Sequence, residues 1–536
     1  MSAAAETFDY IIVGGGNAGC VLANRLTACG RHSVLLLEAG SVGRSPWIGI
    51  PAGFSKLLVN PTYNWRFQSE PEAATNNRVI SVPRGKGLGG STLINGMIYV
   101  RGQPQDYDGW AQAGCRGWSF DDVLPYFLRI EDYDGPEGAL RAHGGPLPLS
   151  TVSLRPEIGE AFIAAAEAAG YARNPDYNGE SQDGFGYYQV NQRDGRRVSA
   201  AEAYLKPSMK RQNLSVRTGA HVLFIELDGK RAVGVTARIG NRDCRFRARG
   251  EVILAAGAAQ TPQLLELSGI GNPDLLQDLG LPVNHALPAV GENYIDHFCT
   301  RMNWRVRQPV TLNEQTRGLK LAMAVAQYAA TRRGILTLGT GLVHGFVRSR
   351  EGLEGPDVQY FFMHASYANA AERVLDREPG MTIGVTQLRP QSRGTIHAVS
   401  PDPFAAPSIR PNFLAEEEDR RVMVEGMKIA RYVVEQAPMD AFRKIEMSPG
   451  PDCRTDADWL DFARSNGQTI YHICGTCRMG TDEKAVTDPT LKVRGIAGLR
   501  VADASIMPTM VSGNTQAAVF MIAEKAAELI LGDRRL

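Results

Sequence analysis

Three glycines near the N-terminus are spaced as in sites that hold a diphosphate, in the segment Gly14-Gly15-Gly16-Asn17-Ala18-Gly19. In this arrangement Gly14 allows a tight turn, Gly16 lets the backbone approach a pyrophosphate, and Gly19 lets a following helix pack closely. Glu38 stands 24 positions after Gly14, near the offset at which an acid accepts hydrogen bonds from a ribose 2′-hydroxyl and repels a 2′-phosphate. These residue types predict a dinucleotide site, and the alternative is a structural βαβ unit whose turn binds nothing.

The residues around these glycines predict the strand, helix and second strand that such a site requires. Residues 8–13 form a short apolar run, which is typical of a parallel strand buried on both faces. Residues 18–26 continue as a helix, whose N-terminal amides and partial positive charge suit a diphosphate. Residues 34–37 form a second apolar run, which Glu38 ends. The sequence therefore predicts a βαβ unit around the glycine turn.

The composition is that of a globular protein large enough for two or more domains. The 536-residue chain is 43% hydrophobic and has a formal net charge of +1, so we expect a large core and no nucleic-acid partner. Its eight cysteines are too few for a disulfide scaffold, and no signal peptide precedes the first strand, so we expect a cytoplasmic protein. Cys474 and Cys477 form a C-x-x-C pair without a second pair at a zinc spacing. We expect packed thiols and no metal there, with redox or metal chemistry as the alternative.

Two further segments carry a resemblance to a known family. Residues 83–96 are dense in glycine, and residues 257–271 contain a small-residue turn that follows the apolar run 252–255. These segments resemble the two signatures of the glucose-methanol-choline (GMC) oxidoreductases, a family of FAD enzymes. The resemblance spans nearly the whole chain, because it continues in Gly291-Glu292-Asn293, Asp296-His297, Ser392-Arg393-Gly394 and the C-terminal segment.

The resemblance implies that the cofactor is FAD and where it is held. Besides Gly14, Gly16, Gly19 and Glu38, the implied FAD contacts are Asn17, Ala18, Ala39, Gly87, Gly90, Ser91, Asn95, Gly96, Met97, Val222, Ala256, Gly257, Asp503, Ala504, Asn514, Thr515 and Gln516. Some members of the family tether the flavin through a histidine in the glycine-rich loop, and the counterpart here is Ile94. Because Ile94 has no nucleophilic group, we expect FAD to be bound non-covalently.

The order of the matching segments predicts a discontinuous α/β architecture. A Rossmann-like FAD-binding domain draws on residues 1–150, 200–305 and 466–536. A substrate-binding domain of the α+β class draws on residues 151–199 and 306–465, and it resembles the family's antiparallel sheet flanked by helices. Strand-like stretches at residues 358–363 and 382–388 agree with this assignment.

No apolar run reaches the ~18 residues of a transmembrane helix. The nearest approach is the alanine-rich stretch 319–330, which Lys320 and Gln327 interrupt and Arg332 and Arg333 follow. We expect a helix packed on the substrate-binding domain. The alternative is peripheral contact with the inner face of a membrane, because basic flanks on an apolar helix suit that interface.

The resemblance also implies which residues are catalytic. In the family, the positions that match His472 and Asn514 face the flavin as a catalytic pair. An alcohol loses hydride more easily as its hydroxyl loses its proton, and a histidine of near-neutral pKa suits that task. Asn514 offers amide N–H donors to the same oxygen. The structural alternative for Asn514 is the N-cap of a helix expected over residues 515–531.

We therefore expect an FAD-dependent alcohol dehydrogenase or oxidase that converts a primary alcohol to an aldehyde by hydride transfer to flavin N5. The electrons would pass to a quinone, a dye or oxygen, and the closest resemblance is to the choline, sorbose and aliphatic-alcohol dehydrogenase branch. A lyase with a structural FAD and a non-catalytic FAD-binding protein are the alternatives.

The sequence does not specify the alcohol. A cation such as choline would require an aromatic cage and an acid, and no spacing in the chain identifies them. The candidates for lining the substrate pocket are Trp65, Phe361, Phe362 and His364, with an ordinary core position as the alternative for each.

Overall fold

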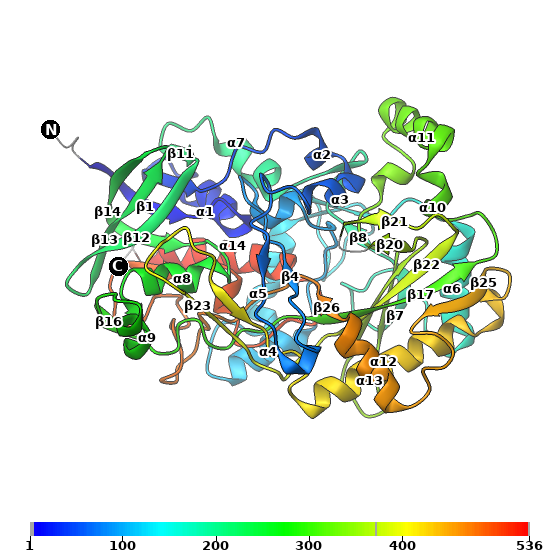
Figure 1. Cartoon of the computed structure of the whole chain (residues 1–536). Helices are drawn as coiled ribbons and strands as arrows, with labels where there is room; N and C mark the ends of the chain where they lie inside the picture. The colour runs from blue at the N-terminus through cyan, green and yellow to red at the C-terminus, as the bar shows by residue number, and fades with distance from the viewer. Residues whose placement is uncertain (1–4, 370–371, 534–536) are drawn as a thin grey trace.

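The computed structural model describes residues 5–369 and 372–533, and two seven-stranded sheets dominate it (Figure 1). Each sheet has its own cluster of buried apolar side chains. The longer helices are α1 (Asn17–Thr27), α4 (Pro104–Gln112), α5 (Phe120–Ile130), α6 (Glu157–Ala168), α8 (Gln260–Leu267), α11 (Gly318–Thr331), α12 (Glu417–Val434), α13 (Asp456–Asn466) and α14 (Gln516–Gly532).

The first sheet contains the predicted βαβ unit. Its strands are β11 (Leu214–Thr218), β2 (Val34–Glu38), β1 (Glu6–Val13), β14 (Arg242–Leu254), β13 (Arg231–Ile239) and β12 (Ala220–Asp228) in that order, with β27 (Leu499–Val501) also paired to β14. β11, β2, β1, β14 and β27 run parallel, whereas β12 and β13 form an antiparallel extension on the first half of β14. The predicted strand, helix and second strand are confirmed.

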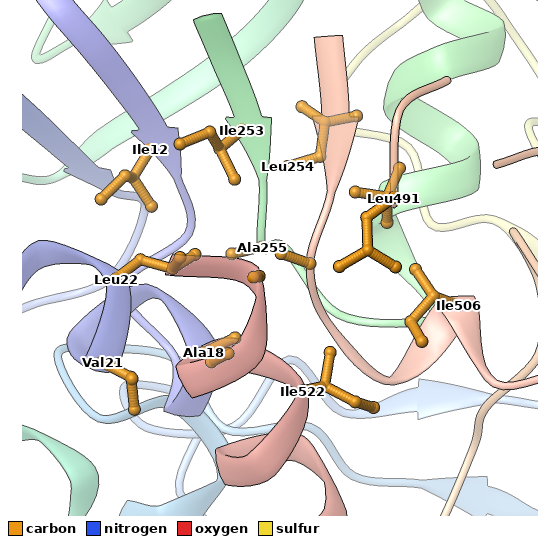
Figure 2. Close-up of a cluster of buried hydrophobic side chains, with 14 of the residues drawn as sticks. Ile12, Ala18, Val21, Leu22, Ile253, Leu254, Ala255, Leu491, Ile506 and Ile522 are labelled. Carbon is orange, nitrogen blue, oxygen red and sulfur yellow. The ribbon is translucent and has the colours of Figure 1, made fainter. Parts of the chain in front are cut away.

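Two helices cover one face of this sheet. α1 packs against α14, and side chains of both helices meet the strands in the core that Figure 2 shows. Gly19 of α1 lies so close to the preceding turn that an added Cβ would fall 1.9 Å from the carbonyl oxygen of Gly14. A glycine is therefore required at this point, as the spacing predicts.

The second sheet is antiparallel throughout. Its strands are β25 (Arg443–Ser448), β17 (Phe298–Val306), β22 (Gly380–Gln387), β19 (Val358–Met363), β18 (Val343–Val347) and β7 (Gly184–Tyr187) in that order, with β26 (Gln468–Thr469) also paired to β17. α12 packs on one face, where Gly426 approaches Val358 and Val385. The antiparallel sheet flanked by helices is confirmed, and the domain boundaries stay a prediction.

α11 does not pack on the body of the protein as expected. It projects from the top of the molecule in Figure 1, and Tyr328 is its one buried side chain. Leu319 is 76% exposed and Met323 is 55% exposed. The prediction of a packed helix is wrong, because only the side of α11 that carries Tyr328 reaches the body of the protein and most of its apolar side chains stay exposed. Among the described residues, no helix has the length and apolar character needed to cross a membrane.

The cysteines of the C-x-x-C pair are core residues. Cys474 and Cys477 are free thiols, fully buried in the cluster that surrounds the first sheet. Their positions agree with the predicted packed thiols.

Candidate active site

A cavity of about 350 Å³ lies between the glycine turn and the second sheet, within the range of ligand pockets. The predicted FAD contacts that line it are Gly14, Gly16, Asn17, Ala18, Glu38, Ala39, Gly90, Ser91, Asn95, Gly96, Met97, Val222, Ala256, Gly257, Asp503, Ala504, Asn514, Thr515 and Gln516. Gly19 and Gly87 lie outside this lining. Segments far apart in the sequence therefore converge on one cavity, and the FAD contacts themselves stay a prediction.

Glu38 holds three glycine-rich segments together. Its Oε2 accepts a hydrogen bond from the amide of Gly15 at 2.8 Å, and its Oε1 accepts from Gly40 at 2.7 Å and Gly87 at 3.0 Å. Burial raises the pKa of the Glu38 carboxyl, and these amide donors oppose that rise. One carboxylate oxygen keeps a lone pair for a ribose hydroxyl, so Glu38 has a structural role that its sequence offset does not reveal.

The backbone around the turn fits the diphosphate of FAD. Gly16 is the N-cap of α1 and provides no side-chain hydrogen bond, so the amides of the first turn are open to an anion. An added Cβ on Gly90 would fall 2.7 Å from Gly16 Cα, and one on Gly257 would meet no atom within 4 Å. Asn17 Oδ1 is buried without a hydrogen-bond partner in the described part of the chain.

Asp503 connects the end of β27 to the turn before α8. Its Oδ2 accepts hydrogen bonds from the Gly257 amide at 2.8 Å and the Thr261 hydroxyl at 2.7 Å, and its Oδ1 accepts from the Ser505 amide at 2.9 Å. The carboxylate is 3% exposed and lines the cavity. Asp503 thus fixes two stretches of backbone at the predicted nucleotide side of the cavity.

His472 lies in a chain of hydrogen bonds that ends at the cavity. Its Nδ1 is 2.9 Å from Nδ1 of His297, whose Nε2 is 3.0 Å from the carbonyl oxygen of Leu388. On the other side of the ring, Nε2 is 3.1 Å from Nδ2 of Asn514. Gln359 donates to Asn514 Oδ1 at 3.2 Å, which directs the Asn514 amide nitrogen toward His472.

These contacts fix the position of each ring proton. A carbonyl oxygen only accepts hydrogen bonds, so His297 carries its proton on Nε2 and presents an unprotonated Nδ1. His472 must then donate from Nδ1, so its Nε2 is unprotonated and accepts the hydrogen bond from Asn514 Nδ2 at the cavity wall. The arrangement gives His472 the tautomer that a proton acceptor needs.

Both imidazoles are neutral near pH 7. Burial lowers the pKa of His472 well below its ordinary value of 6.5, and the nearby His297 and Arg84 lower it further. Burial also lowers the pKa of His297 to about 4, although its hydrogen bond to Leu388 raises it. Nε2 of His472 therefore stays unprotonated near pH 7.

Asp296 and a strained backbone hold His472 in place. Asp296 Oδ1 accepts from the His472 amide at 2.9 Å, while its Oδ2 accepts from the hydroxyls of Tyr294 and Thr469. Tyr471, just before His472, has a φ of +73°, a conformation that is costly for a bulky residue. The backbone is thus strained at the residue that immediately precedes His472.

The structure tests the capping role predicted for the Asn514 side chain, and its catalytic role stays a prediction. α14 begins at Gln516, with Thr515 as its N-cap and no side-chain capping hydrogen bond. The N-cap alternative for Asn514 is therefore wrong, because its side chain bonds to His472 and Gln359 instead. Replacing Asn514 should therefore not cause the loss of stability that removal of an N-cap causes.

Of the four residues predicted to line the substrate pocket, two line the cavity. Phe361 lines the cavity, whereas Phe362 and His364 do not. Phe362 stacks on Phe162 in the core at a centroid distance of 4.4 Å. Trp65 also lines the cavity, but beside His221, which precedes the predicted FAD contact Val222.

Sequence reasoning missed the roles of several site residues. Asp296 and His297 were included only as part of a family resemblance, and Gln359 was not singled out. The signal for Gln359 is its place in the predicted strand, two residues before Phe361 and on the same face.

Comparison with known proteins gives one consistent result. The chain matches the GMC oxidoreductase family profile over residues 8–299 for the N-terminal part and residues 390–523 for the C-terminal part. It is 41% identical to an oxygen-dependent choline dehydrogenase of Chromohalobacter salexigens, over 99% of this chain and 96% of that protein. A choline dehydrogenase of Photobacterium profundum is 39% identical over 99% of this chain and 94% of the relative.

Solved structures agree with the sequence relatives. The crystal structure of pyridoxine 4-oxidase from Mesorbium loti superposes with a TM-score of 0.88 at 31% identity, covering 97% of this chain and 98% of that one. A formate oxidase of Aspergillus oryzae RIB40, studied for the effect of a mutation on FAD modification, superposes with a TM-score of 0.93 at 26% identity over the full length of both chains.

Proposed function

The chain belongs to the GMC oxidoreductase family, and on that premise we propose that it oxidises a primary alcohol to an aldehyde with His472 as the proton acceptor. It is an FAD-dependent oxidoreductase that acts on the CH–OH group of its donor. The hydrogen-bond chain that leaves Nε2 of His472 unprotonated at the cavity wall carries the proposal. FAD, when bound, supplies the hydride acceptor.

In this mechanism His472 and Asn514 have different roles at the alcohol oxygen. Once the alcohol hydroxyl replaces the Asn514 N–H as the donor to His472 Nε2, this nitrogen takes the hydroxyl proton, which makes the adjacent carbon a better hydride donor. The Asn514 amide has two N–H groups, and both it and His472 lie at the cavity wall. Asn514 orients the oxygen and stabilises the negative charge that develops on it. The alcohol would thus lose its hydroxyl proton to His472, and bound FAD would supply the acceptor for the hydride.

Anaerobic mixing of the holoenzyme with primary alcohols tests the proposal. We expect the yellow flavin absorbance to bleach with at least one alcohol, and reoxidation by oxygen, a quinone or a dye to identify the acceptor class. A lyase with a structural FAD would release product without bleaching. Failure of every primary alcohol in a broad panel to bleach the flavin would contradict the proposed oxidation.

We further propose that FAD is held without a covalent bond. Ile94 lines the cavity in the glycine-rich loop, between Leu93 and Asn95, and none of the three carries an imidazole, thiol or phenol. We expect acid precipitation to leave the protein pellet colourless and release yellow FAD into the supernatant. A pellet that stays yellow, with a fluorescent band in a denaturing gel, would show a tethered flavin.

We also propose that this cytoplasmic enzyme contacts the inner face of a membrane through α11. The helix exposes Leu319, Leu321, Met323 and Val325, and Arg317, Lys320, Arg332 and Arg333 lie in it or flank it. Exposed apolar side chains with basic neighbours suit an anionic bilayer surface, where a quinone acceptor would be available.

Vesicle sedimentation tests the contact made by α11. The wild-type protein should sediment with vesicles that contain anionic lipid, and less so at high salt, because screening weakens charge attraction. Met323→Glu should reduce sedimentation to the background level. The control is Met209→Glu, which alters an exposed methionine elsewhere and should leave binding intact. Equal sedimentation of the two variants would exclude α11 as the contact.

A further inference from the structure

Two guanidinium groups line the part of the cavity that faces the second sheet. Arg301 of β17 and Arg373 are half-buried on this wall. Among the described residues, the acids that line the cavity are Glu38 and Asp503, and both of these carboxylates accept hydrogen bonds from backbone amides on the nucleotide side. The wall that faces the substrate is therefore electropositive.

The register of the sheet places Arg301 beside a glycine that also lines the cavity. Arg301 lies opposite Gly384 of β22, and Gly384 lies opposite Phe361 of β19. A Cβ at Gly384 would fall 3.3 Å from Cys299 Sγ and 3.5 Å from Phe361 Cβ. Cys299 and Phe361 thus flank position 384 closely, and both line the cavity on the same sheet face as Arg301.

The same sheet face reaches the catalytic pair. Gln359 and Phe361 are two residues apart on β19, so their side chains share a face. Gln359 donates to Asn514, which contacts His472. Arg301 and the catalytic pair therefore line the same cavity.

The Arg301 guanidinium has no hydrogen bond or ion pair within residues 5–369 and 372–533. Arg305, on the same strand, differs because its guanidinium pairs with Asp376 at 2.6 Å. A half-buried guanidinium without a counter-anion has lost part of its hydration and gains from binding one. Its planar donors match a carboxylate in a bidentate manner.

We propose that the alcohol substrate carries a carboxylate, which Arg301 binds while the hydroxyl lies at His472 and Asn514. The inference rests on the proposed function and names its substrate class, a hydroxycarboxylate. Arg373 adds positive charge to the same wall, although its guanidinium also donates to the Tyr471 hydroxyl at 2.9 Å. A quaternary ammonium such as that of choline meets two like charges there and no acid, so choline is a poor substrate.

The first test compares charged and neutral forms of one molecule. A series of ω-hydroxyalkanoates of increasing chain length is compared with the corresponding primary amides and with choline, by anaerobic flavin reduction in the holoenzyme. We expect the best acid to exceed its amide in kcat/KM by about 10- to 100-fold, the effect of a charge-assisted hydrogen bond. Arg301→Met should bring this ratio to about one, whereas Arg305→Met should keep the wild-type ratio. Amides or choline as effective as the acids in the wild type would overturn the proposal.

A binding measurement without turnover separates this proposal from the proposed function. Titration calorimetry of the holoenzyme with simple alkanoates, which have no hydroxyl, should show binding that weakens with salt and in Arg301→Met but not in Arg305→Met. If no alcohol bleaches the flavin but this binding is present, the proposed function fails and the anion site stands. If neutral alcohols bleach the flavin but no alkanoate binds, the proposed anion site is contradicted and the proposed oxidation stands.

Discussion

Replacing His472 with alanine is expected to slow flavin reduction by about 10²- to 10⁴-fold, the usual contribution of a positioned acid-base group. FAD should stay bound, because the glycine turn and Glu38 on the other side of the cavity remain intact. Anaerobic stopped-flow measurement of flavin bleaching gives the rate, and the absorbance spectrum of the purified variant gives the FAD content.

A second buried histidine provides the control for this variant. His364 is also buried, and burial likewise lowers its pKa, to about 4, but it does not line the cavity. His364→Ala should therefore reduce flavin at close to the wild-type rate. A His472→Ala enzyme with nearly wild-type bleaching would contradict the role of His472 as the proton acceptor.

The pH dependence of the wild-type rate follows from the low pKa of His472. A proton acceptor must be neutral, and a lowered pKa extends the neutral form to more acidic pH. An unperturbed histidine would lose half of its neutral form at pH 6.5, whereas His472 should keep the rate of flavin reduction level between about pH 6 and 8. A rate that falls with a midpoint near pH 6.5 would show that the buried environment does not set the pKa of the base.

The fold was predictable wherever a local pattern determines a local element. The apolar runs around Ile12 and Leu36 define paired buried strands, and Gly19 is needed for the close approach of α1. The strand at residues 358–363 was also predicted with the bounds of β19. The helix at residues 319–330 was predicted as well, but its exposure was not, because the sequence of an isolated helix does not show which of its sides contacts the rest of the protein.

The candidate site was predictable only where residue type and family resemblance coincide. His472 and Asn514 were found in this way, but the hydrogen bonds that orient them come from residues that are distant in sequence. Glu38 was found by its offset, and its contacts with Gly15 and Gly87 depend on loops that only the fold brings together. Strand alternation alone would have separated Phe361 from Phe362, because neighbouring residues in a strand point to opposite faces.

Among the residues whose roles sequence reasoning did not anticipate, we expect His297 to have the largest effect on the rate of flavin reduction. Replacing it with phenylalanine removes the acceptor for the Nδ1–H of His472, and a buried donor without a partner costs about 1–3 kcal/mol. His472 can avoid this cost by carrying its proton on Nε2, which removes the lone pair from the cavity. We therefore expect flavin reduction in His297→Phe to be roughly 5- to 150-fold slower than in the wild type, although His297 itself does not line the cavity.

A glutamine at position 297 distinguishes positioning from simple packing. Its side-chain oxygen can accept from His472 and its amide nitrogen can donate to the Leu388 carbonyl, as His297 does. His297→Gln should therefore recover most of the rate that His297→Phe loses. Melting temperatures measured in parallel show whether either variant is merely unstable. Equal rates in the two variants at equal stability would mean that the contact with His297 does not set the tautomer of His472, and that the cavity orients this ring by other means.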